Sequence, residues 1–317
     1  MSVDLSVDLG RGLTLANPVG LASGTAGFGF ELAQLIDLDT LGALFTKGTT
    51  RDARAGNAPP RVAETAGGML NSIGLQNPGV EHLAREYAPR FAQWRCAVVA
   101  NIAGATVEEY VDCVRILDGA SGIAGYELNI SCPNIAHGLD LGRDPQEAAR
   151  VTAAVREVTK RCVIVKLSPN VTDIAAVAAA VEGAGADAVS AVNTYVGMKI
   201  HRQLRRPVLP RAGTGGLSGP AIKPLALAAV AAVRQVVRIP VIGIGGISDA
   251  GDAIDFMVAG ADAVQVGTAT FTDPSAAVRI VAGLRDHLVA AGMSRPSELR
   301  WQPAADEAAA VIDDSLR

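Results

Sequence analysis

The feature that most constrains this chain is a regular alternation of short β-rich runs with longer, Ala-rich amphipathic stretches. Such alternation is typical of parallel strands joined by right-handed helical crossovers. Eight such runs fit a closed (β/α)8 TIM barrel better than an open doubly wound sheet. A GxGxxG loop after the first run, which would favour the open dinucleotide-binding fold, is missing. The expected strands lie at residues 19–22, 43–46, 97–101, 125–129, 163–167, 188–193, 240–243 and 263–266.

Composition agrees with this α/β fold class. Apolar residues make up 49% of the chain but aromatic residues only 4%, so Ala, Val, Leu and Ile must build the core of buried strands and covering helices. No Pro-rich, Ser-rich or charged stretch divides the 317 residues, which predicts one domain over residues 1–317. The formal charge of −4, with scattered Lys and Arg, gives no basic stripe for nucleic acid.

Targeting segments and cysteine clusters are also missing from the sequence. Residues 1–8 are acidic, and no segment reaches the ~18 apolar residues of a membrane span, so we expect a cytoplasmic protein without membrane contact. Cys96, Cys113, Cys132 and Cys162 form no CxxC pair, which supports neither a structural zinc site nor an iron–sulfur cluster, and no metal is expected. Three of the four lie in or beside apolar runs and are predicted to be buried.

Three segments outside the barrel pattern have their own interpretation. Residues 5–9 and 13–16 flank Gly10-Arg11-Gly12, which predicts an N-terminal β-hairpin that closes the barrel floor. Residues 51–79 and 195–219 are longer than a simple connection needs, and long loops at the catalytic face usually form lids and substrate walls. We expect residues 195–219 to be the lid.

Polar residues stand where the expected strands end, although barrel interiors are filled by apolar layers. Because the carboxyl ends of all barrel strands meet at one rim, these residues should lie close together. They are Thr46-Lys47-Gly48, Asn101, Asn129, Lys166 and Asn193-Thr194.

Glycines follow the last two expected strands. Gly245 and Gly246 come after the seventh, and Gly267 and Thr268 after the eighth. Backbone N–H groups of such loops, with a short helix that begins near Thr268, can bind phosphate, and many barrels have their phosphate site after strands seven and eight.

The segment NISCPN, residues 129–134, holds the strongest catalytic candidate. Cys132 lies between polar residues in the loop after the fourth expected strand, and Pro133 restricts its conformation. A thiol of ordinary pKa ~8.5 becomes a base or a nucleophile once its surroundings favour the thiolate. No histidine stands in a strand-end motif, so the role of base is favoured over a Cys–His nucleophile, although His137 can approach from the same loop.

With these motifs the chain resembles the dihydroorotate dehydrogenase family, specifically its class 1 enzymes with a cysteine base, over almost its whole length. The resemblance implies an FMN-containing (β/α)8 barrel. Seven segments carry it in order: NPVGLAS at 17–23, TKGT at 46–49, NSIGLQNPG at 71–79, NISCPN at 129–134, KLSP at 166–169, GLSGP at 216–220 and GIGGI at 243–247.

The resemblance also implies which residues bind the cofactor and the substrate. Lys166 would stabilise negative charge on the reduced flavin, and Lys47 would serve both the flavin and the orotate carboxylate. The implied FMN contacts are Ser23, Lys47, Gly48, Asn101, Asn129, Lys166, Val192, Gly219, Gly245, Gly246, Gly267 and Thr268. The implied substrate contacts are Lys47, Asn71, Ser72, Ile73, Gly74, Leu75, Asn129, Asn134, Asn193 and Thr194.

The implied reaction oxidises dihydroorotate to orotate in pyrimidine biosynthesis. Cys132 would remove the proton from carbon 5, while a hydride leaves carbon 6 for nitrogen 5 of FMN. A proton beside a carbonyl is acidic enough for a thiolate base, provided that the reacting atoms are held close together.

The sequence says less about the electron acceptor than about the oxidation of the substrate. Cys132 and the short N-terminus argue against the membrane-associated quinone class, which has a serine base. Residues 135–138, IAHG, resemble class 1B, in which a homodimer of the catalytic chain pairs with two FAD and iron–sulfur subunits that pass electrons to NAD. This chain has no cysteine cluster or Rossmann fingerprint of its own, so a partner is implied.

Three other interpretations stay open from the sequence. One is the fumarate-using homodimer of class 1A. A second is a flavoprotein related to dihydropyrimidine dehydrogenase, although Lys47 and the loop at Asn71 favour a substrate with a carboxylate, which uracil lacks. A third is a non-catalytic barrel that binds phosphate ligands, which would be colourless.

Overall fold

Eight parallel strands close into a barrel in the computed structural model, which describes residues 3–131, 141–209 and 213–301. Their order around the barrel is β10-β15-β16-β3-β4-β7-β8-β9, so consecutive barrel strands are neighbours and the last pairs with the first. This confirms the predicted (β/α)8 fold and all eight predicted strands. Their bounds are β3 Val19–Leu21, β4 Ala43–Phe45, β7 Ala97–Ile102, β8 Gly125–Asn129, β9 Cys162–Lys166, β10 Ala188–Ala191, β15 Val241–Ile244 and β16 Ala263–Val266.

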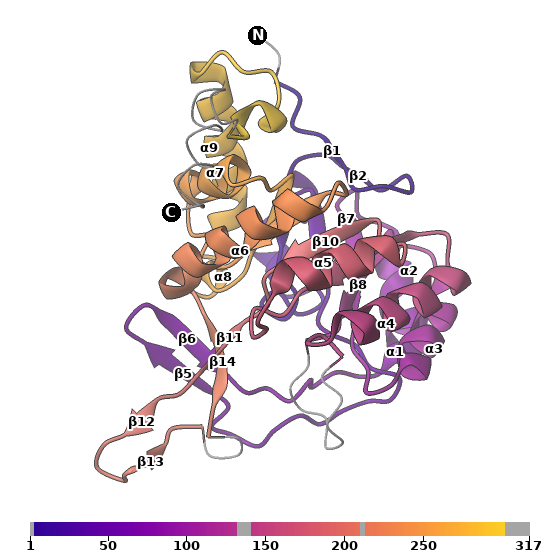
Figure 1. Ribbon diagram of the computed structural model, residues 1–317, viewed down its shortest axis with the longest axis vertical. Coiled ribbons are helices and arrows are strands. Elements are labelled where there is room, and N and C mark those ends of the chain that lie inside the picture. The colour runs from indigo at the N-terminus through magenta and orange to yellow at the C-terminus, as the bar shows by residue number, and fades with distance from the viewer. Residues whose placement is uncertain (1–2, 132–140, 210–212, 302–317) are drawn as a thin grey trace, which may run out of the picture.

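Helices lie against the outside of the barrel (Figure 1). Several begin at a side chain that accepts a hydrogen bond from a free N–H of the first turn, as Asp173 does from the N–H of Ala176. The helices are α1 Val80–His82, α2 Ala88–Phe91, α3 Val107–Asp118, α4 Pro145–Val158, α5 Ile174–Gly183, α6 Lys223–Val236, α7 Ala250–Val258, α8 Ala269–Thr272 and α9 Ala276–Ala290. The π-helical turn η3 Leu83–Tyr87 joins α1 to α2, and the 3₁₀ turns are η1 Leu32–Gln34, η2 Leu38–Thr40, η4 Pro220–Ile222 and η5 Pro296–Leu299.

Successive side chains of each barrel strand point to opposite faces, which divides the core in two. Val163 and Val165 of β9 pack in the large cluster between strands and helices, whereas Cys162 and Ile164 point into the barrel. The N-terminal hairpin, β1 Val7–Asp8 and β2 Thr14–Leu15, is present as predicted. Its Leu9, Leu13 and Leu15 pack against the inward-facing residues of the barrel floor. The hairpin therefore closes the end of the barrel opposite the strands' carboxyl ends.

The two long connections pair with each other, which the sequence did not predict. Within residues 51–79 lie β5 Val62–Thr65 and β6 Gly68–Asn71, and within 195–219 lie β11 Tyr195–Gly197 and β14 Gly215–Ser218. They form one antiparallel sheet in the order β11-β14-β6-β5. The short hairpin of β12 Ile200–His201 and β13 Arg206–Pro207 projects beyond it (Figure 1). The predicted lid movement stays a prediction.

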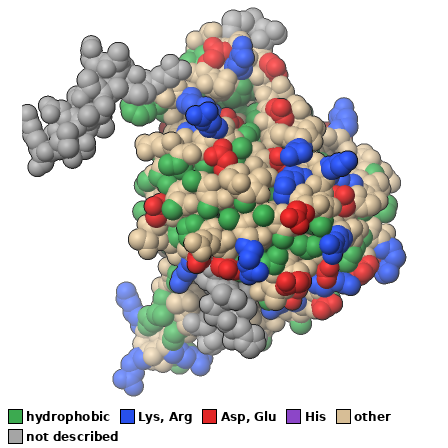
Figure 2. Space-filling view, turned by 45° about the vertical axis from the view of Figure 1, so that its right-hand side comes forward, with side chains coloured by type: hydrophobic (Ala, Val, Ile, Leu, Met, Phe, Trp, Pro, Cys, Tyr) green, Lys and Arg blue, Asp and Glu red, His purple; other side chains and the backbone are tan. Residues whose placement is uncertain are grey.

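Charged side chains of both signs are interspersed over the face seen in Figure 2, and Lys and Arg gather on the projecting hairpin, where Arg202, Arg205 and Arg206 are exposed. Among the described residues, none of the helices combines the length and the hydrophobicity that crossing a bilayer requires. Cytoplasmic location and a single domain over residues 1–317 stay predictions.

Candidate active site

The carboxyl ends of the barrel strands surround one cavity of about 400 Å³, a size typical of small-molecule sites. Strand-end residues form its floor, and the antiparallel sheet of the two long connections supplies Met69, Asn71 and Gly216 to its wall. The barrel thus brings together side chains from segments that are distant in sequence, as the strand-end pattern predicted.

Two lysines and a pair of amides lie on one side of the cavity. Lys166 ends β9 and is only 5% exposed, and Lys47 follows β4. Asn193 Nδ2 donates a hydrogen bond to Asn129 Oδ1 at 3.1 Å, and Asn193 Oδ1 accepts from the backbone N–H of Thr194 at 2.8 Å. These bonds fix the orientation of the Asn193 amide, and amides offer both donors and acceptors to a ligand.

The loop after β6 forms another part of the lining, and Asn57 holds it in place. Asn57 Nδ2 donates to the backbone oxygen of Ser72 at 2.7 Å, and the Asn57 N–H donates to the oxygen of Ile73 at 2.8 Å. The next residue, Gly74, has φ +74°, and a Cβ there would meet Asn57 Oδ1 at 2.5 Å. Glycine is therefore required for the close approach of these two segments.

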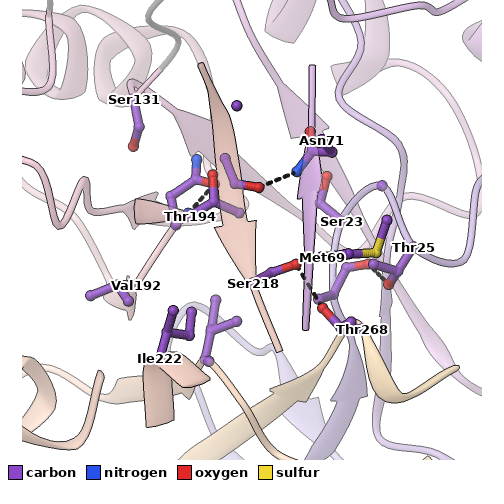
Figure 3. A pocket seen from close by; sticks show the side chains of 18 of the residues that line it. Ser23, Thr25, Met69, Asn71, Ser131, Val192, Thr194, Ser218, Ile222 and Thr268 are labelled. Atoms are coloured by element: carbon purple, nitrogen blue, oxygen red, sulfur yellow. Dashed lines mark hydrogen bonds between the residues drawn. The ribbon is translucent and has the colours of Figure 1, made fainter. Parts of the chain in front are cut away.

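The opposite side of the cavity is built from glycines and hydroxyls. Gly245 and Gly246 follow β15 with φ +132° and +75°, and Thr268 precedes α8. Thr268 Oγ1 donates to Ser218 Oγ at 2.8 Å, on the far side of the cavity from Ser131 (Figure 3). The charged side chains of the described lining, those of Lys47, Arg143 and Lys166, come from other segments. An anion here would be bound by backbone N–H groups and hydroxyls.

Nearly all predicted site residues that the structure describes line this one cavity. They are Ser23, Lys47, Gly48, Asn71, Ser72, Ile73, Gly74, Leu75, Asn129, Lys166, Val192, Asn193, Thr194, Gly219, Gly245, Gly246, Gly267 and Thr268.

Three predicted site residues do not appear in that lining. Asn101 is fully buried behind Gly48, where a Cβ would meet Asn101 Oδ1 at 3.0 Å. Cys132 and Asn134 lie outside the described residues, although Ser131 and Arg143, on either side of that segment, both line the cavity.

The other three cysteines are buried, as predicted. Burial raises the pKa of Cys96, Cys113 and Cys162 to about 12, because a thiolate loses its hydration in the core. The Cys162 thiol also donates a hydrogen bond to the oxygen of Leu9 at 3.3 Å, at the barrel floor. These three thiols are poor bases at neutral pH.

Sequence reasoning missed a polar layer inside the barrel, below the cavity. Glu127, Ser190 and Gln265 are fully buried there, beside Asn101 and Lys166. The sequence held a signal for Glu127: it lies two residues before Asn129 in the same strand, so the side chains of both residues face the barrel interior. Also missed were Met69, Ser131, Arg143, Asn170, Ser218 and Phe271 of the lining.

The chemistry of the cavity fits a ligand with a phosphate at one end and a flat, heteroatom-rich ring system at the other. The glycine and hydroxyl side suits the phosphate, and the lysines and paired amides suit ring carbonyls and an added carboxylate. FMN with a planar anionic substrate has these properties.

Comparisons with known proteins agree with this assignment. A sequence model of the family described as dihydroorotate dehydrogenase matches residues 6–288. A protein of Porphyromonas gingivalis named "dihydroorotate dehydrogenase B (NAD(+)), catalytic subunit" is 50% identical over 298 residues, which cover 94% of this chain and 97% of the relative. Proteins with the same name from Desulforamulus reducens (51% identical, 94% of this chain, 98% of the relative) and Listeria monocytogenes (47%, 91% and 95%) are similar over comparable lengths. The chain therefore belongs to the dihydroorotate dehydrogenase family.

Proposed function

We propose that this chain is the catalytic subunit of an NAD-linked dihydroorotate dehydrogenase that uses FMN to oxidise dihydroorotate to orotate in pyrimidine biosynthesis. The observation that carries the proposal is one cavity that gathers a glycine-lined anion site, two lysines and a set of oriented amides from segments distant in sequence, with all seven motifs represented in its lining. The names of relatives that share about half of its residues support the same activity.

FMN would lie with its phosphate against Gly245, Gly246, Gly267 and Thr268, and Gly219 would contact the cofactor beside them. Three of these glycines have no room for a side chain: a Cβ at Gly219 would meet Gly68 Cα at 2.6 Å, one at Gly245 would meet Ala226 Cβ at 2.7 Å, and one at Gly246 would meet the oxygen of Gly219 at 2.9 Å. The close packing keeps backbone groups at the cavity surface, where N–H groups can reach a phosphate. Ser23, Lys47, Gly48, Asn129, Lys166 and Val192 would contact the rest of the cofactor, and buried Asn101 would support Gly48. When bound, FMN supplies an acceptor for the hydride that leaves carbon 6 of dihydroorotate.

The substrate would be held by Lys47 and by the amides of Asn71, Asn129, Asn134 and Asn193. Lys47 would pair with its carboxylate, and the amides would match its ring N–H and carbonyl groups in both senses. Thr194 and the loop of residues 72–75, which Asn57 fixes, would complete the pocket.

Cys132 would act as the base. Its thiolate would take the proton from carbon 5, and the electron pair of that C–H bond would form the new double bond to carbon 6. Ser131, the residue directly before Cys132 in the sequence, lines the cavity, which supports this assignment. The other three thiols are buried outside the cavity lining, which leaves Cys132 for this role.

Electrons would leave through a partner subunit that carries FAD and an iron–sulfur cluster, in a complex of two catalytic and two electron-transfer chains. The printed name "catalytic subunit" of the relatives supports the existence of such a partner. Among the described residues no group of His, Cys, Asp and Glu side chains could hold a metal ion, so the cluster is assigned to the partner.

The deciding experiment mixes the purified chain, with its bound flavin, with dihydroorotate under anaerobic conditions and follows the flavin absorbance. Bleaching establishes the half-reaction, and dihydrouracil serves as the control substrate. Colour should return with NAD only when the partner subunit is added. Return of colour with fumarate alone would replace class 1B by class 1A, and no bleaching of a yellow protein would remove the substrate assignment.

Substitution of Cys132 tests the base. Cys132→Ala should slow bleaching by roughly 10²–10⁴-fold, the range for loss of a positioned base, while FMN stays bound. Cys113→Ala, which alters a buried thiol remote from the cavity lining, is the matched control and should bleach at the wild-type rate. Unchanged kinetics in the Cys132 variant would remove the assigned role.

A further inference from the structure

A carboxylate lies inside the barrel, where apolar side chains normally fill the space. Glu127 is at the middle of β8, its side chain is 0% exposed, and its backbone pairs with Asn101 of β7 and Ile164 of β9. The layer directly below is apolar and includes Val99, Ile164 and Ile242. Burial of an ionised carboxylate is costly unless it is paired and hydrogen-bonded, so this position needs a compensating environment.

Three neutral donors provide part of that environment. Gln265 Nε2 and Ser190 Oγ donate to Oε1 of Glu127 at 2.7 and 2.8 Å, and Asn101 Nδ2 donates to Oε2 at 2.5 Å. The donors come from β16, β10 and β7, so the carboxylate ties together strands from across the barrel. Hydrogen bonds to an ionised acceptor are stronger than those between neutral groups.

The remaining partner is Lys166, whose Nζ lies 3.8 Å from Glu127 Oε2. That separation is too long for a direct hydrogen bond but short enough for strong attraction between two buried charges. Lys166 belongs to the cavity lining and Glu127 does not. Lys166 therefore links the buried carboxylate to the cavity, and its ammonium group makes no hydrogen bond to Glu127 at this distance.

We infer that Glu127 is a positioning residue for Lys166: its carboxylate fixes the ammonium group at the cavity floor and offsets part of its charge toward the flavin. The inference rests on the proposed function, in that the cavity holds a flavin beside Lys166. A flavin gains negative charge when it is reduced, so the net charge below it sets how easily it accepts electrons. Glu127 thereby keeps the midpoint potential of the bound flavin lower than Lys166 alone would make it.

The test is the midpoint potential of FMN bound to the purified chain, measured by equilibration with reference dyes. Glu127→Gln keeps the shape and removes the charge. The new amide group can donate to Asn101 Oδ1, which has no hydrogen-bond partner in the described structure, if the Asn101 amide turns over. The potential should become more positive, because the ammonium charge is no longer offset.

Two comparisons separate this role from general loosening of the barrel. Ile164→Val removes a methylene group opposite Glu127, changes no charge and should leave the potential at the wild-type value. In a Lys166→Met background, Glu127→Gln should shift the potential much less than it does with Lys166 present. Glu127 acts through Lys166, so its effect on the flavin is lost when Lys166 is absent, and the two substitutions are not additive. An unchanged potential in Glu127→Gln, or equal shifts in both backgrounds, would overturn the inference.

Glu127→Asp provides a second variant in case the amide variant does not fold. It keeps the charge but withdraws it from Lys166, so the potential should move in the same direction by a smaller amount, and no movement would count against the inference. Failure of the wild-type chain to bind FMN would remove the proposed function itself. If the wild-type chain binds FMN and is bleached by dihydroorotate, but the Glu127 variants show no shift in potential, only the role of Glu127 is removed.

Discussion

The four cysteines illustrate how position decides the chemistry of one residue type. Cys96, Cys113 and Cys162 are packed in apolar clusters, and burial raises the pKa of each thiol to about 12. A thiol with that pKa carries almost no thiolate at neutral or mildly alkaline pH, and the thiolate is the reactive form. Reactivity toward alkylating reagents should therefore differ sharply between these three residues and Cys132.

We expect iodoacetamide at pH 8 to label Cys132 in the native protein and to leave the three buried thiols unmodified. Peptide mass spectrometry measures the labelling at each site, and bound orotate should protect Cys132 if it lies at the substrate. The same treatment in concentrated urea is the control, because unfolding returns all four thiols to an ordinary pKa. Rapid native labelling of Cys96, Cys113 or Cys162 would contradict the burial.

At the scale of single residues, the sequence predicted those site residues whose role follows from their position at the end of a strand. Lys47, Asn129, Lys166 and Thr194 could be placed at the cavity because each follows or ends a strand, and all barrel strands end at one rim. Glu127 could not be placed, because polar residues inside a strand were not expected in a barrel interior. Its contacts join strands β8, β16 and β10, which only the closed barrel brings together.

At the scale of elements, the two long connections form a wall that local sequence could not reveal. β6 pairs with β14, and Asn71 Nδ2 donates to the oxygen of Gly216, a partner 145 residues away. The strands are only four residues long and rich in glycine, so they lack the alternation that marks longer strands. The sequence therefore indicated loops where the structure has a sheet, although it located the cavity wall correctly.

Gly216 tests the contact between this sheet and the proposed substrate site. A Cβ at Gly216 would meet Thr194 Oγ1 at 2.2 Å and Asn71 Nδ2 at 3.3 Å. Gly216→Ala should displace both side chains and raise the KM for dihydroorotate by at least ~10-fold, since misplacement by about 1 Å costs up to ~10²-fold. FMN should stay bound, because the glycines near its phosphate are untouched. Steady-state kinetics and flavin absorbance give the two quantities.

Gly183→Ala is the matched control for that substitution. Gly183 ends α5, and a Cβ there would meet nothing within 4 Å. The exchange should leave the KM unchanged and raise the free energy of unfolding by up to ~1 kcal/mol, because alanine favours the helix. A KM that rises equally in both variants would mean that the wall sheet does not hold the substrate.

At the scale of the whole molecule, the barrel separates the source of stability from the source of chemistry. The hairpin and the apolar layers fill the floor, the polar layer of Glu127 lies above them, and the cavity opens at the far end. The floor was predictable from the sequence because its hairpin is local, with Gly10-Arg11-Gly12 between two apolar runs. Changes at the floor should therefore alter stability without altering catalysis.

Leu9→Ala makes that separation measurable. Leu9 is fully buried against the barrel floor, so the cavity left by the shorter side chain should lower the free energy of unfolding by about 2–5 kcal/mol. Urea titration followed by circular dichroism measures the loss, and Leu35→Ala, at a side chain 68% exposed, should change stability by no more than ~0.5 kcal/mol. None of the residues at the barrel floor lines the cavity. The KM for dihydroorotate and the rate of flavin bleaching should therefore equal those of the wild type below the unfolding transition. A variant that lost affinity for dihydroorotate in parallel with stability would show that the floor and the catalytic face are coupled through the polar layer between them.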